Sequence, residues 1–326
     1  MRLLADIGGT NARFALQAQA GAEAHSGGFL DVEVLACSDY PTLDAALAAY
    51  LAGARARGMA VDGLRHAAIA IATPVEGDVV AMTNHHWRFS TAALRSAFGL
   101  DTLLVVNDFA ALAMALPHLG DAGRERVGPA CAAPPDRPLG LIGPGTGLGV
   151  SALVPHAGRW IVLPGEGGHA SFAPTMRQEI RILEALLEEY GHVSAERLLS
   201  GAGLEAIHRV LCGERLPAAR ISAQALDGSS GACRESVDVF CAVLGCVAGN
   251  VALTLGATGG MYIGGGIVPR LGRLFHASAF RTRFEAKGRL QPWLARVPTW
   301  VVTEPYPALR GAAAMLADHV AAHAGT

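Results

Sequence analysis

A pattern of strand, glycine turn and strand occurs twice in this sequence and limits the folds that it can adopt. The first occurrence is RLLADIGGTNARFAL, residues 2–16, and the second is LGLIGPGTGLGVSALV, residues 139–154. In each, apolar residues flank a polar tip, as in a β-hairpin. Because one local architecture recurs, the sequence predicts two related α/β units, although no longer self-similarity accompanies the two turns.

Strand and helix patterns alternate along the rest of the chain. Residues 40–58 have the spacing of an amphipathic helix with Thr42 as N-cap and Gly58 as its stop, and residues 89–100 predict a short helix capped by Ser90. The other elements that we expect are strands at 66–75, 103–106, 261–264 and 299–304, helical segments at 109–116, 175–211 and 308–323, and a polar, proline-rich loop at 120–138.

The uncharged segment 239–269 is long enough to span a membrane. Glycines interrupt its second half, and Asn250 lies near its middle. These features favour a buried helix at about 237–255 followed by a buried strand, so we expect no membrane partner.

Composition excludes several classes of function. The chain has 326 residues, 51% of them hydrophobic, which suffices for two domains with large cores. Its net charge of −2 gives no electrostatic reason to expect nucleic-acid binding. Lys287 is the only lysine, and no G-x-x-x-x-G-K-[ST] motif occurs, which excludes a Walker-type phosphate site. The six scattered cysteines, with no C-x-x-C and no secretory signal, predict reduced, buried thiols in a cytoplasmic protein.

The glycine turns are candidate phosphate sites. Glycine allows positive φ and lets backbone N–H groups approach a ligand closely, and consecutive amides form anion-binding concavities. The hydroxyls of Thr10 and Thr146 would add donors, and Asp6 could orient Mg²⁺ directly or through water. The alternative is that each turn is only a tight hairpin. A third cluster, Gly264–Gly266, follows another predicted strand and favours the nucleotide interpretation.

A carboxylate in apolar surroundings raises a separate question. Asp108, with Asn107, stands between a buried strand and the apolar helix that follows. Burying a carboxylate without a partner costs several kcal/mol. Asp108 could be the N-cap of the helix, or a base exposed at the carboxyl end of a strand, or both with one oxygen each.

Seven motifs together resemble those of bacterial glucokinases of the proteobacterial type. They are DIGGTNARFAL, MTNHHW, VVNDFAALAMALP, GPGTGLGVSALV, LPGEGGHASFAP, GHVSAERLLSG and GGMYIGGGIVPR, and they occur in the expected order and spacing from about residue 3 to about residue 315. The resemblance implies a two-domain actin-like ATPase (RNase H-like) α/β fold with an interdomain cleft. The small domain would comprise residues 1–117 and 308–326, and the large domain residues 118–307.

The resemblance also implies an activity, the ATP-dependent phosphorylation of D-glucose at its 6-hydroxyl to glucose 6-phosphate. ATP and Mg²⁺ would be the cofactors, glucose and ATP the partners, and the protein a cytoplasmic homodimer. Asp108 matches the catalytic base of the family. The residues that match or lie beside its sugar-binding positions are Asn84, Asn107, Asp108, Glu166, His169 and Glu196. Those that match its ATP-binding positions are Asp6, Gly8, Gly9, Thr10, Asn11, Gly145, Thr146, Gly147, Gly264, Gly265 and Gly266, with Asp6 at the metal.

Each sugar-site residue also has a plain structural interpretation. Glu196 could be a surface charge on a helix, His169 a loop histidine bonded to a carbonyl group, and Glu166 a solvated loop acid. The sequence departs from the family in having Ala5 where glycine is common. It lacks the cysteine cluster that follows EGGH in the other bacterial sugar-kinase family, so we expect no structural zinc.

Three other functions stay open. A related hexose kinase could prefer another sugar. A sugar-responsive regulator of the same fold would need a DNA-binding domain, yet the sequence begins almost at once with the first glycine hairpin and lacks a basic helix-turn-helix. A chaperone or filament ATPase of this fold would not need the set of Asn107, Asp108, Glu166, His169 and Glu196.

Overall fold

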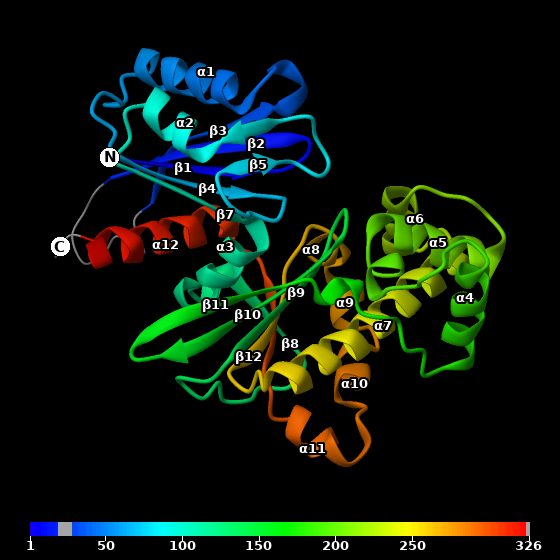
Figure 1. The fold of residues 1–326 in the computed structure, drawn as a ribbon. Helices are drawn as coiled ribbons and strands as arrows, with labels where there is room; N and C mark the ends of the chain where they lie inside the picture. Colours follow the sequence, from blue (N-terminus) through cyan, green and yellow to red (C-terminus); the bar gives the residue numbers. More distant parts are fainter. Residues whose placement is uncertain (19–27, 324–326) are drawn as a thin grey trace. The chain divides into compact units, whose positions relative to one another are not determined.

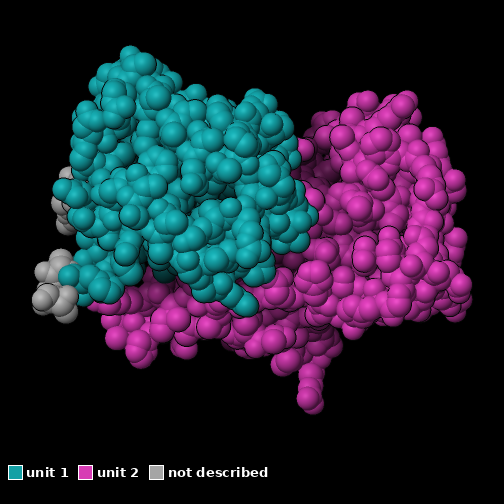
Figure 2. Space-filling view, turned by 45° about the horizontal axis from the view of Figure 1, so that its top comes forward, with its two compact units in different colours: residues 1–119, 305–326 teal, residues 120–304 magenta. Residues whose placement is uncertain are grey.

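The computed structural model describes residues 1–18 and 28–323 (Figure 1). The chain divides into two compact units, residues 1–119 with 305–326 and residues 120–304, which are coloured separately in Figure 2. The expected small domain, 1–117 with 308–326, includes the stretches 19–27 and 324–326, which lie outside the described residues.

Unit 1 is a five-stranded mixed sheet with helices on both faces. The strand order is β3-β2-β1-β4-β7, in which β1 pairs antiparallel with β2 and parallel with β4. The strands are β1 (Arg2–Ile7), β2 (Asn11–Gln17), β3 (Phe29–Ala36), β4 (His66–Ile71) and β7 (Thr102–Asn107), and β5 (Val79–Ala81) and β6 (Arg88–Ser90) form a separate pair. The helices are α1 (Leu43–Ala56), α2 (Thr91–Ala97), α3 (Asp108–Ala115) and α12 (Pro307–His323).

Strand periodicity divides the apolar residues of unit 1 between two cores. Leu3 and Ile7 on one face of β1 belong to the cluster that contains residues of α1 and α2, whereas Leu4 belongs to the cluster that contains residues of α3 and α12. On that second face, a Cβ added at Gly311 of α12 would overlap the carbonyl group of Ala111 in α3. The last helix of the chain therefore closes the core of the first unit.

Unit 2 contains a six-stranded sheet in the order β11-β10-β9-β12-β13-β8. The strands are β8 (Arg124–Val127), β9 (Leu139–Pro144), β10 (Leu148–His156), β11 (Arg159–Gly165), β12 (Gly260–Ile263) and β13 (Thr299–Val302). The helices are α4 (Arg177–Leu187), α5 (Gly201–Cys212), α6 (Ala218–Asp227), α7 (Gly231–Leu255), α8 (Val268–Leu271), α9 (Arg273–His276), α10 (Phe280–Glu285) and α11 (Gln291–Leu294).

The two sheets confirm the predicted duplication. In the first sheet, β1 pairs antiparallel with β2 and parallel with β4, and β4 pairs parallel with β7. In the second sheet, β9 pairs antiparallel with β10 and parallel with β12, and β12 pairs parallel with β13. The series β3-β2-β1-β4-β7 therefore has the same order and directions as β11-β10-β9-β12-β13. Strand β8 adds an antiparallel edge to the second sheet only.

The predicted caps and the buried helix are confirmed. The Thr42 hydroxyl accepts a hydrogen bond from Ala45 N–H, and the Ser90 hydroxyl accepts one from Ala93 N–H. Within the described residues, α7 is the one helix long and apolar enough to span a membrane, and 67% of its most apolar stretch is buried in the protein. It begins at Gly231, earlier than expected, and serves as a core helix.

Several sequence-based expectations are wrong. Residues 124–127 of the expected loop form β8, because they pair with β13 and because Arg124 and Arg126 stack on the ring of Trp300. The helical run at 175–211 is broken, and its second helix starts only at Gly201, after a 3₁₀ turn at Ala195–Arg197. All six cysteines are free thiols, but Cys212 is exposed and Cys131 half-buried rather than buried.

Candidate functional site

The first glycine turn joins β1 to β2 and packs against the loop that carries Asn84. Gly8 N–H donates to the Asn11 carbonyl oxygen at 2.9 Å, which closes the turn. A Cβ added at Gly9 would lie 3.2 Å from both the Cβ and the carbonyl oxygen of Asn84. The structure thus brings Asn84 against the turn that contains Thr10. Gly8 and Gly9 do not adopt positive φ, so this close approach, rather than backbone conformation, explains the glycine at position 9.

Asn107, and not Asp108, is the N-cap of α3, which corrects the capping role considered for Asp108. The Asn107 Oδ1 atom accepts hydrogen bonds from Phe109 N–H at 3.0 Å and Ala110 N–H at 3.1 Å. Its Nδ2 group donates to the carbonyl oxygen of Thr73 and to Asp108 Oδ1, at 3.3 and 3.2 Å. Asp108 is the first residue of the helix, and its Oδ1 also accepts from Phe109 N–H at 2.8 Å.

The carboxyl groups of Asp6 and Asp108 influence each other electrostatically. Both lie at the carboxyl ends of strands in one sheet, with β4 between them. Burial raises the pKa of Asp108 to about 6, and the negative charge of Asp6 adds to this shift. Burial also raises the pKa of Asp6, although Arg13, 3.0 Å away, opposes the shift. Asp108 therefore gains or loses its proton near pH 6, well above the range of an ordinary aspartate.

A divalent cation held by Asp6 would offset the repulsion between the carboxylates of Asp6 and Asp108. Two carboxylates that repel one another in a half-buried setting are stabilised by a positive charge. Mg²⁺ favours one or two carboxylates together with phosphate oxygens and water. Among the described residues, no group of three or more His, Cys, Asp or Glu side chains is arranged to hold a metal by itself. A cation here would therefore depend on ligands supplied by a bound phosphate and water.

The second glycine turn, in unit 2, rests on the start of α5. Gly145 N–H donates to the Gly147 carbonyl oxygen at 2.8 Å, and Gly201 N–H donates to the Gly145 carbonyl oxygen at 3.0 Å. The hydroxyl of Ser200 caps the helix through Gly203 N–H at 3.1 Å. Thr146 therefore lies at the tip of a turn that a capped helix supports.

Glu196 joins this turn to the other predicted sugar-site residues. Its Oε2 accepts a hydrogen bond from Leu148 N–H at 2.8 Å, and a Cβ added at Gly147 would lie 2.5 Å from the same oxygen. Its Oε1 lies 4.0 Å from His169 Nε2, which is also 4.0 Å from a carboxylate oxygen of Glu166. The structure thus brings Glu166, His169 and Glu196 together in unit 2.

The plain interpretations of two of these residues are wrong. Glu196 belongs to a 3₁₀ turn, and its carboxylate accepts a hydrogen bond from Leu148 N–H, so it is not a free charge on the surface of a helix. Among the described residues, the ring of His169 forms no hydrogen bond to a carbonyl group. The side chain of Glu166 is 73% exposed, as expected for a solvated acid, yet it faces His169.

The third glycine cluster lies beside the second turn. Gly264 N–H donates to the Ile142 carbonyl oxygen at 2.8 Å. Gly265 has a φ of 75°, and a Cβ there would meet the backbone of Pro144. Gly264–Gly266 and the turn at 145–147 therefore converge on the end of β9.

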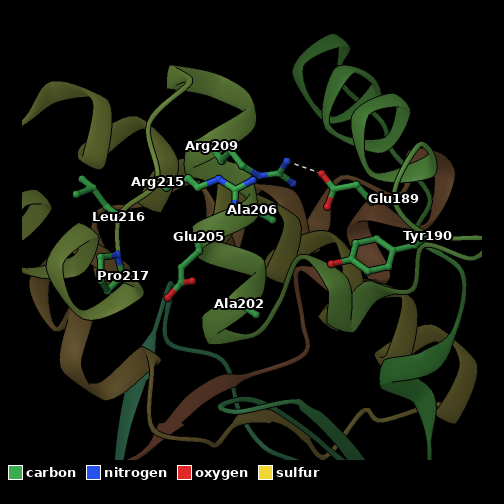
Figure 3. Close-up of a pocket in the computed structure, with 9 residues that line it drawn as sticks. All are labelled: Glu189, Tyr190, Ala202, Glu205, Ala206, Arg209, Arg215, Leu216 and Pro217. Carbon is green, nitrogen blue, oxygen red and sulfur yellow. Dashed lines mark ion pairs between the residues drawn. The ribbon is translucent and has the colours of Figure 1, made fainter.

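Two cavities lie next to these residues in unit 2, and both are bordered by Glu189 and Tyr190. One, of about 370 Å³, is lined by His169, Glu189, Tyr190, Gly191, His192, Ser194, Glu196 and Arg197. The other, of about 430 Å³, is lined by Glu189, Tyr190, Ala202, Glu205, Ala206, Arg209, Arg215, Leu216 and Pro217 (Figure 3). In Figure 3 the carboxylate of Glu189 pairs with the guanidinium of Arg209 across the second cavity.

The cavities add residues that the sequence did not single out. Tyr190 lies just after the end of α4. Arg197 stacks on its ring, with the guanidinium carbon 4.0 Å from the ring centroid. No motif or spacing marks Tyr190 or Arg209 in the sequence, because their proximity arises from the packing of α4 against α5.

Comparison with known proteins agrees with this arrangement. A family model described as glucokinase matches residues 3–319. A glucokinase of Chromobacterium violaceum is 55% identical, over 98% of this chain and 90% of that protein. The bifunctional protein glk of Paraburkholderia xenovorans is 51% identical over 99% of this chain, which spans 50% of that longer protein. The crystal structure of a glucokinase from an Antarctic psychrotroph is 35% identical, with a TM-score of 0.87 over 97% of this chain and 98% of that one.

These matches cover nearly the whole chain, and the structural match extends the likeness to the complete fold. They confirm the predicted actin-like ATPase fold, of which the repeated strand order of the two units is the visible sign. The chain belongs to the glucokinase family.

Proposed function

We propose that this protein transfers the terminal phosphoryl group of ATP to the 6-hydroxyl of D-glucose, with Asp108 as the general base. The family supports the reaction, and one observation supports the role of the residue. The carboxyl group of Asp108 stands at the end of β7 with a pKa of about 6, so at neutral pH it is mostly ionised but still a useful proton acceptor.

The contacts of Asp108 suit a base with a fixed orientation. Its Oδ1 is held by Phe109 N–H and by the amide of Asn107, which itself is fixed as the helix cap. Both of these hydrogen bonds go to Oδ1, so Oδ2 is the oxygen that would accept the proton of the sugar hydroxyl. As that proton moves to Oδ2, the sugar oxygen forms its bond to phosphorus and the bond to the leaving ADP oxygen breaks.

We assign sugar recognition to the residues that match the sugar-binding positions of the family. Asn84 and Asn107 would act from unit 1, and Glu166, His169 and Glu196 from unit 2. Hexose hydroxyls both donate and accept hydrogen bonds, and carboxylates accept from neighbouring hydroxyls with strict geometry. Glu196 keeps one oxygen on Leu148 N–H, so its Oε1, on the side of His169, would be the oxygen offered to the sugar.

ATP binding is assigned to the three glycine clusters. The turns at Asp6–Asn11 and Gly145–Gly147 would place backbone amides and the hydroxyls of Thr10 and Thr146 around the phosphates, and Gly264–Gly266 would border the adenosine. Asp6 would hold Mg²⁺, directly or through water. When bound, the metal would neutralise charge on the phosphates.

Two further expectations stay proposals. We propose that the protein is a cytoplasmic homodimer, without a nucleic-acid or membrane partner. A different hexose preference is the main alternative for the substrate, because epimers differ by one hydroxyl and the residues above do not rank them.

The decisive experiment is a coupled assay of ADP release with glucose, mannose, fructose and glucosamine. Glucose should give the highest kcat/KM, and ATP hydrolysis without sugar should be slow. The Asp108→Ala variant should bind glucose but lose most turnover, whereas Asp101→Ala, which removes an exposed carboxylate of the same unit, should not. Sugar-independent ATP hydrolysis at the full rate would contradict the proposed function.

A further inference from the structure

The one lysine of the chain lies against a cysteine. Of the 26 lysine and arginine residues, only residue 287 is lysine, and it follows α10 in unit 2. Its Nζ lies 3.2 Å from Cys246 Sγ, 3.0 Å from the Cys246 carbonyl oxygen and 2.6 Å from Asn250 Oδ1. All three acceptors belong to α7, and no carboxylate of a described residue forms an ion pair with Lys287.

Helix α7 is shaped to receive this side chain. A Cβ added at Gly249 would lie 3.0 Å from Lys287 Cε and 2.5 Å from the carbonyl oxygen of Phe284. Glycine at this position therefore leaves space for the lysine stem between α7 and the end of α10. Lys287 is half-buried, and Cys246 is 7% exposed, so the amine and the thiol meet at the edge of the core.

We propose that Cys246 and Lys287 form a reversible S–N cross-link, a sulfenamide, when the protein meets hydrogen peroxide. Thiolates are the species that react with peroxides. Sulfenic acids condense with nitrogen nucleophiles as well as with thiols. The nearest side-chain nitrogen is already in contact with the sulfur, and the molecule of oxidant is small enough to reach a thiol at the edge of the core.

The reaction balances in two steps. The thiolate sulfur attacks one oxygen of the peroxide, the O–O bond breaks, and the departing hydroxide takes a proton from the ammonium group of Lys287 to leave as water, which gives the sulfenic acid and the neutral amine. The neutral lysine amine then attacks the sulfur, the S–O bond breaks, and the second oxygen leaves as water. Sulfur is oxidised by two electrons, and one peroxide is reduced to two waters. A small thiol reverses the link by attacking the sulfur and returning the amine.

The identity of residue 287 fits this chemistry. An arginine would keep the positive charge but has no unprotonated nitrogen to attack sulfur, because the guanidinium is not deprotonated in proteins. In a chain whose 25 other lysine or arginine positions are all arginine, lysine is kept at the one position in contact with the thiol. Cys212 is a natural contrast, because its thiol is exposed and faces the Ala232 carbonyl oxygen instead.

A single lysine makes the test direct, because a lysine-specific endoprotease cuts the unfolded chain once, after residue 287. Wild-type protein is treated with hydrogen peroxide, quenched with catalase, unfolded in urea with a thiol-alkylating reagent, and digested. We expect the uncut chain to accumulate with peroxide and the two fragments to reappear after dithiothreitol. After chymotryptic digestion, the joined peptides should be about 2 Da lighter than the sum of their parents, since two hydrogens are lost.

Three variants keep the result specific. Cys246→Ser should be cut fully after peroxide, and Cys212→Ser should stay resistant like the wild type. In Lys287→Arg, Cys246 should instead be trapped as its dimedone adduct. Full cleavage of peroxide-treated wild type, with Cys246 intact or present as a sulfinic acid, would overturn the proposal. A joined peptide that carries an additional oxygen would overturn the direct S–N bond.

Discussion

Replacing Asp108 with asparagine should make the protein more stable as well as inactive. The pKa of this carboxyl group is about 6 in the folded protein against 3.8 for the free side chain. The folded state therefore binds the proton more tightly than the unfolded state. Below pH 3.8 the carboxyl group is protonated in both states and does not lower the free energy of unfolding. As the pH rises, its ionisation lowers the free energy of unfolding increasingly, and this loss levels off above pH 6. Asparagine keeps an oxygen for Phe109 N–H but carries no charge.

The size of the effect follows from the shift. About two pKa units correspond to about 3 kcal/mol at 1.36 kcal/mol per unit, and partial exposure of the side chain lowers this to about 2–3 kcal/mol. The variant should gain this free energy of unfolding at pH 8, about half of it at pH 5, and almost none near pH 3. The loss of the base should lower kcat by at least about a hundredfold.

Urea unfolding of the wild type and the variant at pH 5, 6, 7 and 8 measures the stability, and the coupled assay measures kcat. Asp101→Asn, at an exposed carboxylate on the same unit, is the matched control and should follow the wild type at every pH. A stability difference that is absent at pH 8, or that does not change with pH, would refute the claim that the folded state penalises the charge. A kcat near that of the wild type would refute the role of base.

Three other measurements test the site. The kcat/KM of the wild type should fall about tenfold per pH unit below pH 6, because protonated Asp108 accepts no proton; a flat profile from pH 7 to pH 5 would argue against it. Gly147→Ala should raise KM for glucose about tenfold, because the new methyl group displaces the Glu196 carboxylate. A methyl group at Gly145 does not meet Glu196, so Gly145→Ala should leave KM for glucose unchanged, whatever it does to KM for ATP; equal effects of the two variants on KM for glucose would contradict this placement. Asn107→Ala should cost about 1 kcal/mol in urea unfolding through the lost cap and should also lower kcat, and a variant that loses only stability would show that Asn107 does not orient the base.

Local signals in the sequence predicted the parts of the fold that local chemistry determines. The caps at Thr42 and Ser90 and the two glycine hairpins each depend on residues within a few positions, and each was found in place. The same holds for α7, because its uncharged part from Val239 onward leaves burial or a membrane as the only options.

Elements that depend on distant partners escaped prediction. The edge strands β3 and β11 and the polar strand β8 form because a neighbouring strand supplies hydrogen bonds and, for β8, because Trp300 supplies a surface for two arginines. None of this is visible within the segments themselves. The break before α5 is similar, since Ala195 N–H bonds to the Ala170 carbonyl oxygen and draws the chain out of the helix.

The candidate site was predicted in outline from resemblance, and its details come from geometry. Asparagine and aspartate are equally good caps, so the sequence does not say which of residues 107 and 108 takes that role. Glu196 looks like an ordinary helix charge in sequence, and only the fold shows its bond to Leu148 N–H. The glycines at 9 and 147 are explained by what they touch, and not by positive φ.

The place of α12 has a consequence for biosynthesis. Unit 1 is built from two stretches of the sequence, 1–119 and 305–326, whereas unit 2 is the one continuous stretch between them. During translation the ribosome completes every residue of unit 2 before it makes the helix that covers Leu4 and Ala111. One face of the first sheet therefore waits uncovered until α12 has been made, and deletion of α12 should harm the part of unit 1 that was made first.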